Sequence, residues 1–555
     1  MAQNDKGILR VGSCKGVSYK NGGYAETCYR GGEERRRPDL LQRVSRCWDA
    51  MAAFREERKR CKRFTYGDQW SDTMPSMFGS IKEEEYIVSQ GNLPLKNNLI
   101  RRLVRNVLGV FRNQWAPPRC VARDKNEQRQ ADVMERLLEY NLERNRMEEM
   151  YARTMEEFLI SGMAVLRKWF GRKGGETDCW TDFVSPEKFF IDTASRDFRN
   201  RDISLIGEIH DMEFEALCAS FASDASEYER LAAIYSPLRG NGGGFGEMIP
   251  GSDEAGRCRV IEAWVREYRP HYLCHDRLTG EYFRIELSLF PEMVEEVNRR
   301  RMAETDADWS RCIESRWVME EEWRYYFLTP DGIVLREGRT PYNHGRHPYT
   351  VKAYPFIDGE IHSFVADIID QQKFTNRLIS MYDWILRASA KGVLLFPEGS
   401  LPEGVDISDI AEEWSRFNGV IVYRPRVGVP LPQQVHSNAS NNGITDLLSI
   451  QMKMMEDISG VNNALQGKLD STSMSGTLYD QQTRNSLTAL ADLLKSYNDF
   501  IMEATAADAS NIRQFYTPSL IGAIIGERES FNQTDNFFNP TFDFSIREGK
   551  ANLNK

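Results

Sequence analysis

A polar stretch between two helical segments is the feature that most restricts how this chain folds. It runs from Ile458 to Leu487 and reads ISGVNNALQGKLDSTSMSGTLYDQQTRNSL. Asn, Gly, Ser and Thr dominate the part up to Gly476, and such residues favour turns and loops over helix interiors. The residues on either side recur at helical spacing, which predicts helices over 442–458 and 477–514. The fold must therefore hold a polar, glycine-containing loop between two helices.

A helix and a small α/β segment precede these two helices. Apolar residues repeat at helical spacing across 361–387, for example at Phe364, Ile368 and Leu378. The following residues, 391–436, predict a strand, a short helix and a second strand, with prolines at the strand edges that prevent further pairing. The C-terminal third therefore has the order helix, small α/β segment, helix, polar loop, long helix.

The first part of the chain predicts an arm followed by helices. Residues 1–35 are rich in Gly and polar residues, and they predict a flexible arm that cannot bury enough apolar area to fold alone. Helical patterns then begin at Pro38, continue across 96–115 and extend along one long helix over 124–159.

From about Met163 to Phe356 the apolar period changes from helical to strand-like. Aromatic and β-branched residues gather in short runs that predict strands, namely MAVLRKWF, KFFID, SLIGEIH, RVIEAWVREY, RWVMEEEWRYYFL and GIVL. A helix is expected among them over 289–309, and the tail FFNPTFDFSIREG predicts one or two further strands. The fold class is therefore α+β.

Composition and charge exclude several classes of protein. No apolar run approaches the roughly 18 residues of a membrane span, and the N-terminus lacks the apolar core of a secretion signal, so a cytosolic product without membrane contact is expected. The net charge of −10 argues against a protein that clamps nucleic acid over its whole surface. The 10 cysteines form no C-x-x-C pair, which predicts reduced thiols and no zinc ribbon.

The sequence contains no convincing catalytic signature. Residues 460–468 read GVNNALQGK, but a phosphate-binding loop needs four residues between its glycines and Ser or Thr after the lysine, where this chain has Leu469. The GGGFG run at 242–246 has the wrong spacing for a dinucleotide site. We therefore expect no catalytic residue and no cofactor.

The histidines offer a weak case for a metal. His271 and His275 lie four residues apart in a strand-like run, with Cys274 between them, but no second pair of ligands accompanies them. His344 and His347 are expected to be solvated in a turn. We therefore expect no metal site.

The order of segments resembles that of the portal proteins of tailed bacteriophages, in particular of short-tailed phages. The run QQKFTNRLIS at 371–380 is similar to the first stem helix of portals, and SGTLYDQQTRNS at 475–486 resembles the segment that opens the helix beyond their tunnel loop. The runs ISGMAVLRKWF and FVSPEKFFIDTASRDFRNRDISLIGEIHDM resemble the portal wing, although Asp192 is followed by Thr193 where many relatives have proline.

The resemblance implies a portal-like α+β fold, with a helical stem, a long crown-side helix, a mixed α/β wing and a small α/β clip. The implied segments are a flexible arm (1–35), the wing (36–360), the first stem helix (361–390), the clip (391–436), the second stem helix (437–459), the tunnel loop (460–476), the crown-side helix (477–515) and strands that return to the wing (516–555).

The resemblance also implies a physical role for the polar loop. A loop that projects into a DNA channel must touch a moving polyanion without gripping it, and each added cation would add salt-dependent binding. The residues expected to face DNA are Asn462, Asn463, Gln466, Lys468, Ser471, Thr472 and Ser473. Arg424 and Arg426 are expected as clip contacts, and Arg58, Lys59 and Arg60 as a contact with capsid protein or DNA; an ordinary solvated surface is the alternative in each case.

The resulting hypothesis is a portal vertex protein of the virion that turns over no substrate. It implies a homo-oligomeric ring, a dodecamer, that packages, retains and ejects double-stranded DNA and is assembled in the host cytoplasm. The implied partners are the terminase motor, the major capsid protein and head–tail adaptor or tail proteins. The alternatives are a nucleotide- or metal-dependent DNA-processing enzyme, and a helical scaffold unrelated to DNA.

Overall fold

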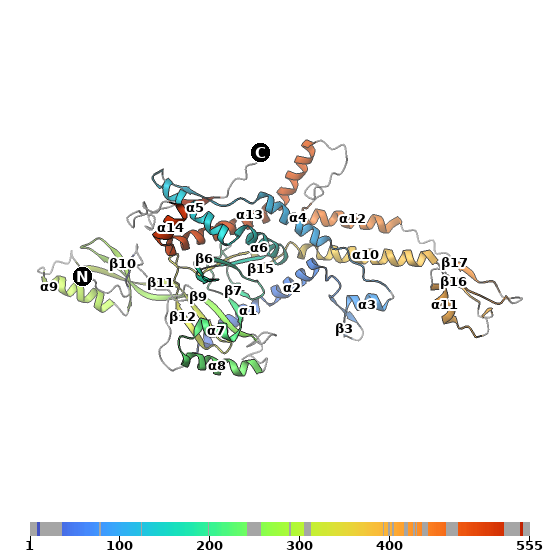
Figure 1. Cartoon of the computed structure of the whole chain (residues 1–555), viewed down its shortest axis with the longest axis horizontal. Coiled ribbons are helices and arrows are strands. Elements are labelled where there is room, and N and C mark those ends of the chain that lie inside the picture. Colours follow the sequence, from blue (N-terminus) through green and yellow to red (C-terminus); the bar gives the residue numbers. More distant parts are fainter. Residues whose placement is uncertain are drawn as a thin grey trace. The chain divides into compact units, whose positions relative to one another are not determined.

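The computed structural model divides the chain into two compact units (Figure 1). The first unit comprises Met1–Lys62, Val104–Ala366 and Asn463–Lys555, and the second comprises Arg63–Leu103 and Asp367–Asn462. The structure describes residues 8–10, 36–76, 79–90, 92–123, 125–197, 199–240, 257–287, 290–304, 312–391, 393–397, 400–401, 404–415, 420–425, 428, 430–435, 442–461, 476–526 and 544–547.

A seven-stranded antiparallel sheet is the largest element of the first unit. Its strands are β1 (Ile8–Arg10), β7 (Phe189–Ile191), β8 (Leu205–Met212), β9 (Cys258–Asp276), β10 (Tyr282–Glu286), β11 (Ile313–Leu328) and β12 (Val334–Arg339). The order is β1-β10-β9-β11-β12, and β8 also pairs with β9 and with β7. Within the segment expected to be a flexible arm that cannot fold alone, Ile8–Arg10 pair with β10 of the sheet.

The sheet buries its apolar face against α1 (Pro38–Ala50), α7 (Phe214–Phe221) and α8 (Ala225–Gly240). Trp264 of β9 lies in this core and is fully buried, and Val44 of α1 packs in the same cluster. The strand predictions are confirmed, but the sequence analysis did not predict α7 and α8. At the far end of β9 and β11, the turn Pro291–Glu295 and helix α9 (Glu296–Glu304) contribute to a smaller core (Figure 1).

A second layer of the first unit joins distant parts of the sequence. The three-stranded sheet β13-β5-β6 comprises Tyr349–Ala353, Met163–Lys173 and Glu176–Phe183. The long helix α13 (Gly476–Phe515) contributes Ile512 to a core with α5 (Gln128–Arg144), and α14 (Pro518–Ile525) contributes Ile521. The tail contains this unpredicted helix, and its one described strand, β18 (Phe544–Arg547), pairs with β4 (Arg119–Ala122).

The prediction of one long helix over 124–159 is wrong. The chain forms a 3₁₀ turn at Lys125–Glu127, then α5 (Gln128–Arg144) and α6 (Met147–Ser161), with Arg146 in the left-handed region at φ 50°. A tertiary contact explains the interruption, because Asn145 accepts a hydrogen bond from the backbone N–H of Thr181 and donates to the carbonyl oxygen of Cys179. The polar residue that weakened the helical pattern therefore binds the neighbouring strand.

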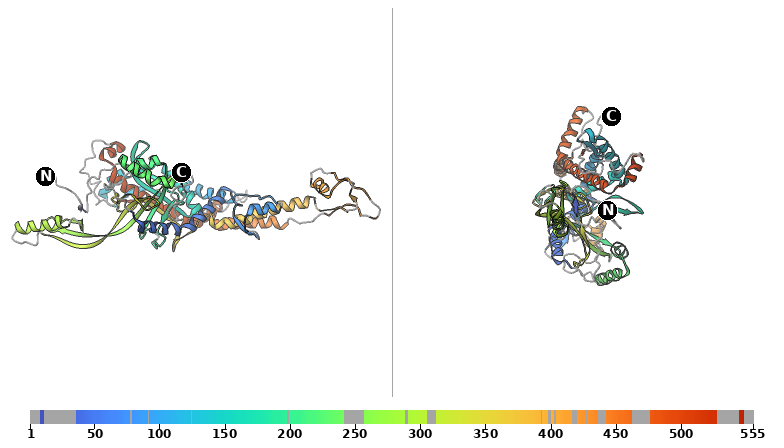
Figure 2. Two further views of the ribbon diagram at one scale, coloured as in Figure 1. Left: turned by 90° about the horizontal axis from the view of Figure 1, so that it is seen from below. Right: turned by 90° about the vertical axis from the view of Figure 1, so that its left-hand side faces the viewer.

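The second unit is mainly helical (Figures 1 and 2). It contains the end of α2 (Ala52–Tyr66), the β2–β3 hairpin (Thr73–Ser76 and Gly79–Lys82), α3 (Glu83–Ser89), the start of α4 (Leu99–Gln114), α10 (Ala366–Lys391), α11 (Ile407–Ser415), α12 (Asn442–Ser459) and the short pair β16–β17 (Val393–Leu395 and Gln433–Val435). The predicted helix, strand, helix, strand, helix order is confirmed here. No helix in the described part of the chain offers an apolar stretch that could cross a bilayer.

Candidate functional site

The QQKFTNRLIS run of α10 binds the segment of the second unit that precedes α4. The side-chain oxygen of Gln372 accepts hydrogen bonds from the backbone N–H groups of Leu99, at 2.9 Å, and Ile100, at 3.2 Å. The first turn of a helix leaves such N–H groups without partners inside the helix, so Gln372 caps α4 from a helix 273 residues away in sequence. Gln372 is itself fully buried.

Other members of the run extend this polar contact. Asn376 accepts a hydrogen bond from the backbone N–H of Asn97 and donates to the side-chain oxygen of Gln69. Ser380 accepts a hydrogen bond from the backbone N–H of Leu95. The spacing of four residues places these polar side chains on one face of α10, and this face fixes the helix against the 63–103 segment.

Charged residues beside this polar face form a second set of contacts. Arg377 donates two hydrogen bonds to Glu83, whose side chain is only 2% exposed, and Lys373 contacts Asp72 at 2.7 Å. A buried carboxylate needs such partners, because an unpaired charge out of water is strongly unfavourable. The β2–β3 hairpin and α3 are therefore tied to α10 through Asp72 and Glu83.

The second unit also exposes apolar side chains on its two long helices. Leu447, Ile450, Met454 and Ile458 of α12 are between 44% and 48% exposed and follow one face of the helix. Phe374, Met381 and Trp384 of α10 are between 42% and 51% exposed. We call these two sets the apolar stripes; such contiguous apolar surface marks an interaction site more often than a solvated face.

The predicted loop residues fall outside the part of the chain that the structure describes. They are Asn462, Asn463, Gln466, Lys468, Ser471, Thr472 and Ser473, together with Arg426 of the small α/β segment. Arg424 is described and exposed, and its backbone N–H donates to the carbonyl oxygen of Ser400. The contacts expected of the loop residues and of Arg426 therefore stay predictions.

Arg58 is not available as a surface contact. Its side chain is 4% exposed and forms ion pairs with Glu157, at 2.7 Å, and Glu187, at 3.2 Å. Lys59 and Arg60 are more exposed, and each pairs with a glutamate one turn earlier on the same helix. The helical pattern showed the basic charge but not which face of α2 packs against α6, so the interpretation of Arg58 as a contact residue is corrected.

Helix α13, which follows the polar loop, is anchored in the first unit by buried polar contacts. The hydroxyl of Tyr497 donates to the carbonyl oxygen of Tyr151, at 2.6 Å. Lys168 and Asp508, both almost fully buried, form an ion pair at 2.6 Å. Burial lowers the pKa of Lys168 and raises the pKa of Asp508, and the pairing opposes both shifts.

The histidines differ from the sequence prediction. His347 is buried and makes an edge contact with the Trp323 ring, so the expectation of a solvated turn histidine is wrong, and burial lowers its pKa to about 3.

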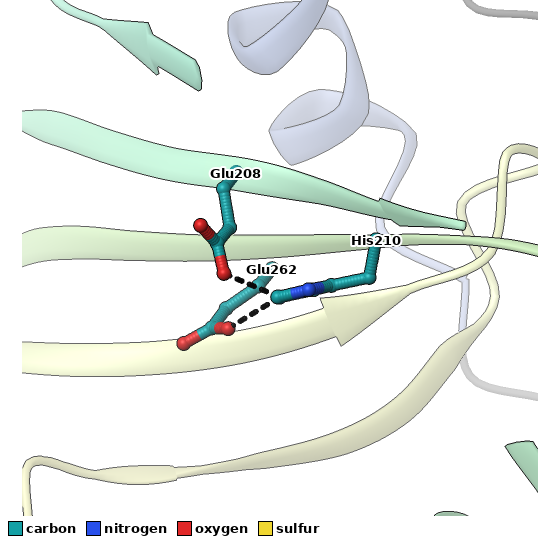
Figure 3. A group of neighbouring side chains, drawn as sticks. All are labelled: Glu208, His210 and Glu262. Carbon is teal, nitrogen blue, oxygen red and sulfur yellow. Dashed lines mark hydrogen bonds and ion pairs between the residues drawn. The ribbon is translucent and has the colours of Figure 1, made fainter. Parts of the chain in front are cut away.

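The sequence analysis also missed a cluster of Glu208, His210 and Glu262 in the large sheet (Figure 3). The available signal was the Glu-x-His spacing in a strand, which places both side chains on one face.

Comparison with known families identifies the class of this protein. The sequence matches the family described as phage P22-like portal protein over residues 41–541. No curated protein sequence matches the chain. The match covers most of the chain, so the protein belongs to the phage P22-like portal protein family. It is a portal vertex protein for the DNA channel and genome packaging of a phage capsid, and nothing in the match supports a DNA-processing enzyme.

Proposed function

We propose that this chain assembles with copies of itself into a dodecameric ring around the DNA channel, and that the apolar stripes form contacts between neighbouring copies. The stripes are the observation that carries this proposal. Fully burying a Leu or Ile side chain stabilises a protein by roughly 1.5–3 kcal/mol, so several half-exposed residues repeated around a ring represent a large gain on assembly. On a solvated monomer, a stripe of this kind contributes no free energy of burial.

The segments then take the following roles. Helix α10 forms the first stem helix, within the segment 361–390. Residues 391–436 form the clip, and α12 forms the second stem helix, within the segment 437–459. The tunnel loop is 460–476 and α13 is the crown-side helix in 477–515, while 36–360 form the wing and 516–555 return to it. The pairing of β18 with β4 supports the return of the tail.

The tunnel loop lines the channel without holding DNA. Its Asn, Gln, Ser and Thr side chains hydrogen-bond transiently to any sequence, and Lys468 is offset by Asp470. Arg424 and Arg426 of the clip and Lys59 and Arg60 of α2 remain candidates for contacts with DNA or protein partners.

The ring would serve the whole life of the virion and turn over no substrate itself. It is assembled in the host cytoplasm, joins the major capsid protein at one vertex and docks the terminase motor, whose ATPase belongs to another chain. After packaging it retains the DNA, binds head–tail adaptor or tail proteins and releases the genome on ejection.

Mass measurement of the purified full chain tests the ring. We expect a particle near twelve times 64.1 kDa by native mass spectrometry. Ile450→Asp places a charge in the α12 stripe and should shift the particle toward single chains, whereas Ser449→Asp places the same charge on an exposed neighbouring position and should leave the ring intact. A wild-type protein that stays monomeric at micromolar concentration contradicts the proposal.

Packaging measurements test the tunnel loop. Replacing Ser471, Thr472 and Ser473 with lysine should slow DNA entry, because each phosphate contact adds salt-dependent affinity. Replacing the same residues with asparagine keeps the loop polar and neutral and should leave packaging near the wild-type rate. The readout is nuclease-protected DNA per capsid, with ring assembly checked separately. Equal packaging by the two variants would contradict the proposal that the loop lines the channel.

A further inference from the structure

The Glu208, His210 and Glu262 cluster lies on two paired strands of the large sheet. In the antiparallel register of β8 and β9, Glu208 is directly opposite Glu262, and His210 follows two residues later on the same face as Glu208. The Nε2 atom of His210 is 3.0 Å from Glu208 Oε1 and 2.8 Å from Glu262 Oε2 (Figure 3). One atom from each of the three side chains lies within 4.8 Å of the other two.

The residues around the cluster hold both carboxylates in place. Trp264 Nε1 donates to Glu262 Oε1 at 2.8 Å, which leaves Oε2 directed at His210. The guanidinium of Arg167, from β5 in the other sheet, reaches Glu208 and Glu262 at 3.1 Å each. Glu262 is fully buried, so its charge cannot be compensated by solvent.

The charge of this arrangement calls for one more positive group. Two carboxylates and one guanidinium sum to −1 when His210 is neutral, and a buried net charge is unfavourable. A proton on His210 supplies one solution: burial alone would lower the pKa of His210, but the two glutamates outweigh it and raise that pKa. A divalent cation bound by neutral His210 and both glutamates brings the sum to +1 instead, a charge that water in the pocket lined by Glu208 and His210 can screen.

The geometry suits a small transition-metal ion. Zn²⁺ takes His nitrogen and carboxylate oxygen at about 2.0–2.2 Å in a tetrahedral shell, which places neighbouring ligand atoms roughly 3.3–3.5 Å apart. The observed separations of 2.8 and 3.0 Å need to widen by only about half an ångström. The cluster borders a pocket of about 540 Å³ that His210 also lines, so water has access to a fourth position.

We propose that Glu208, His210 and Glu262 form a binding site for one divalent transition-metal ion, with Zn²⁺ as the best match and a water molecule as the fourth ligand. Binding displaces the proton from His210, because only the neutral imidazole nitrogen can ligate. The ion joins β8 to β9, because its ligands come from both strands. The sequence analysis expected no metal, since Glu262 lies 52 residues from His210 in the chain.

Zinc titration of the untagged full chain tests the site. After removal of metals with EDTA, calorimetry should show one Zn²⁺ per chain with a dissociation constant below about 10 µM for a preformed three-ligand site. His210→Gln should lose at least tenfold in affinity, whereas His275→Gln, a partly exposed histidine of the same sheet, should bind as wild type. Zinc binding that is unchanged in His210→Gln, or absent in the wild type, overturns the proposal.

A spectroscopic readout covers the case in which His210→Gln fails to fold. X-ray absorption of the zinc-loaded wild type should show a first shell of nitrogen and oxygen at about 2.0–2.1 Å with one imidazole. A sulfur shell at about 2.3 Å would instead assign the ion to cysteines and overturn the proposal. Glu208→Gln provides a second variant, because it removes one ligand charge with little change in shape.

Discussion

The capping of α4 by Gln372 leads to a local prediction that does not depend on ring assembly. In Gln372→Ala the backbone N–H of Ile100 loses its acceptor, that of Leu99 keeps only the carbonyl oxygen of Asn97, and this carbonyl loses one of its two donors. Loss of a helix cap costs about 0.5–2 kcal/mol, and each buried group left without a partner costs about 1–3 kcal/mol. Partial relaxation and water entry reduce the sum, so we expect the first turn of α4 to lose about 2–4 kcal/mol of local stability.

Hydrogen–deuterium exchange measures this loss directly. A fall of 2–4 kcal/mol corresponds to a decrease in amide protection of roughly 30- to 1,000-fold, at 1.4 kcal/mol per tenfold change. The decrease should be confined to peptides that cover 95–103, and Gln371→Ala, one position along α10, should leave the same peptides within about threefold of wild type. Wild-type protection of 99–103 in Gln372→Ala would refute the assignment of Gln372 as the cap.

Three further predictions concern buried groups of the first unit. His347→Phe should reduce the acid sensitivity of the fold. The pKa of His347 in the folded chain is lowered to about 3, so only the unfolded chain binds the proton as pH falls below about 6.5. In thermal unfolding, the wild type should therefore lose about 2–3 kcal/mol more free energy of unfolding than the variant between pH 7.5 and 4.5. Lys168→Met should destabilise by about 3–5 kcal/mol, because it leaves Asp508 buried and unpaired, and adding Asp508→Leu should restore most of that loss in chemical denaturation. Gly207→Ala should prevent soluble expression, because the new Cβ would meet a backbone oxygen of β9, whereas Gly109→Ala, which meets no atom within 4 Å, should raise the melting temperature.

Local patterns were sufficient to predict the elements but not their long-range partners. The apolar period of α10 and the strand alternation of β8 are set by neighbours a few residues away, so both elements could be predicted. The partner of Gln372 lies 273 residues earlier, and the Trp323 ring that packs against His347 belongs to β11, so no local pattern could indicate either contact. The break at Asn145 belongs to the same class, because a tertiary hydrogen bond overrides helix propensity there.

The candidate site shows the same division between local and long-range information. Glu208 and His210 alternate in one strand, and this spacing alone places them on one face. The third member, Glu262, enters only through the β8–β9 register, and Arg167 only through the contact between two sheets. A search for charged residues within apolar strand runs would have selected Glu262, because a charge at a buried strand position requires a partner.

The second unit buries polar side chains beside its apolar core and leaves other apolar side chains exposed, which is the distribution that the proposed ring requires. Gln372 and Asn376 are fully buried, whereas Trp384 and Ile450 are about half exposed. Buried hydrogen-bond networks specify one arrangement but contribute little net free energy, since unfolding returns their groups to water. In the proposed ring, the exposed apolar side chains of α10 and α12 would be covered by neighbouring copies. It follows that the second unit should gain much of its stability from the ring, so its resistance to proteolysis should rise with protein concentration while that of the first unit stays constant.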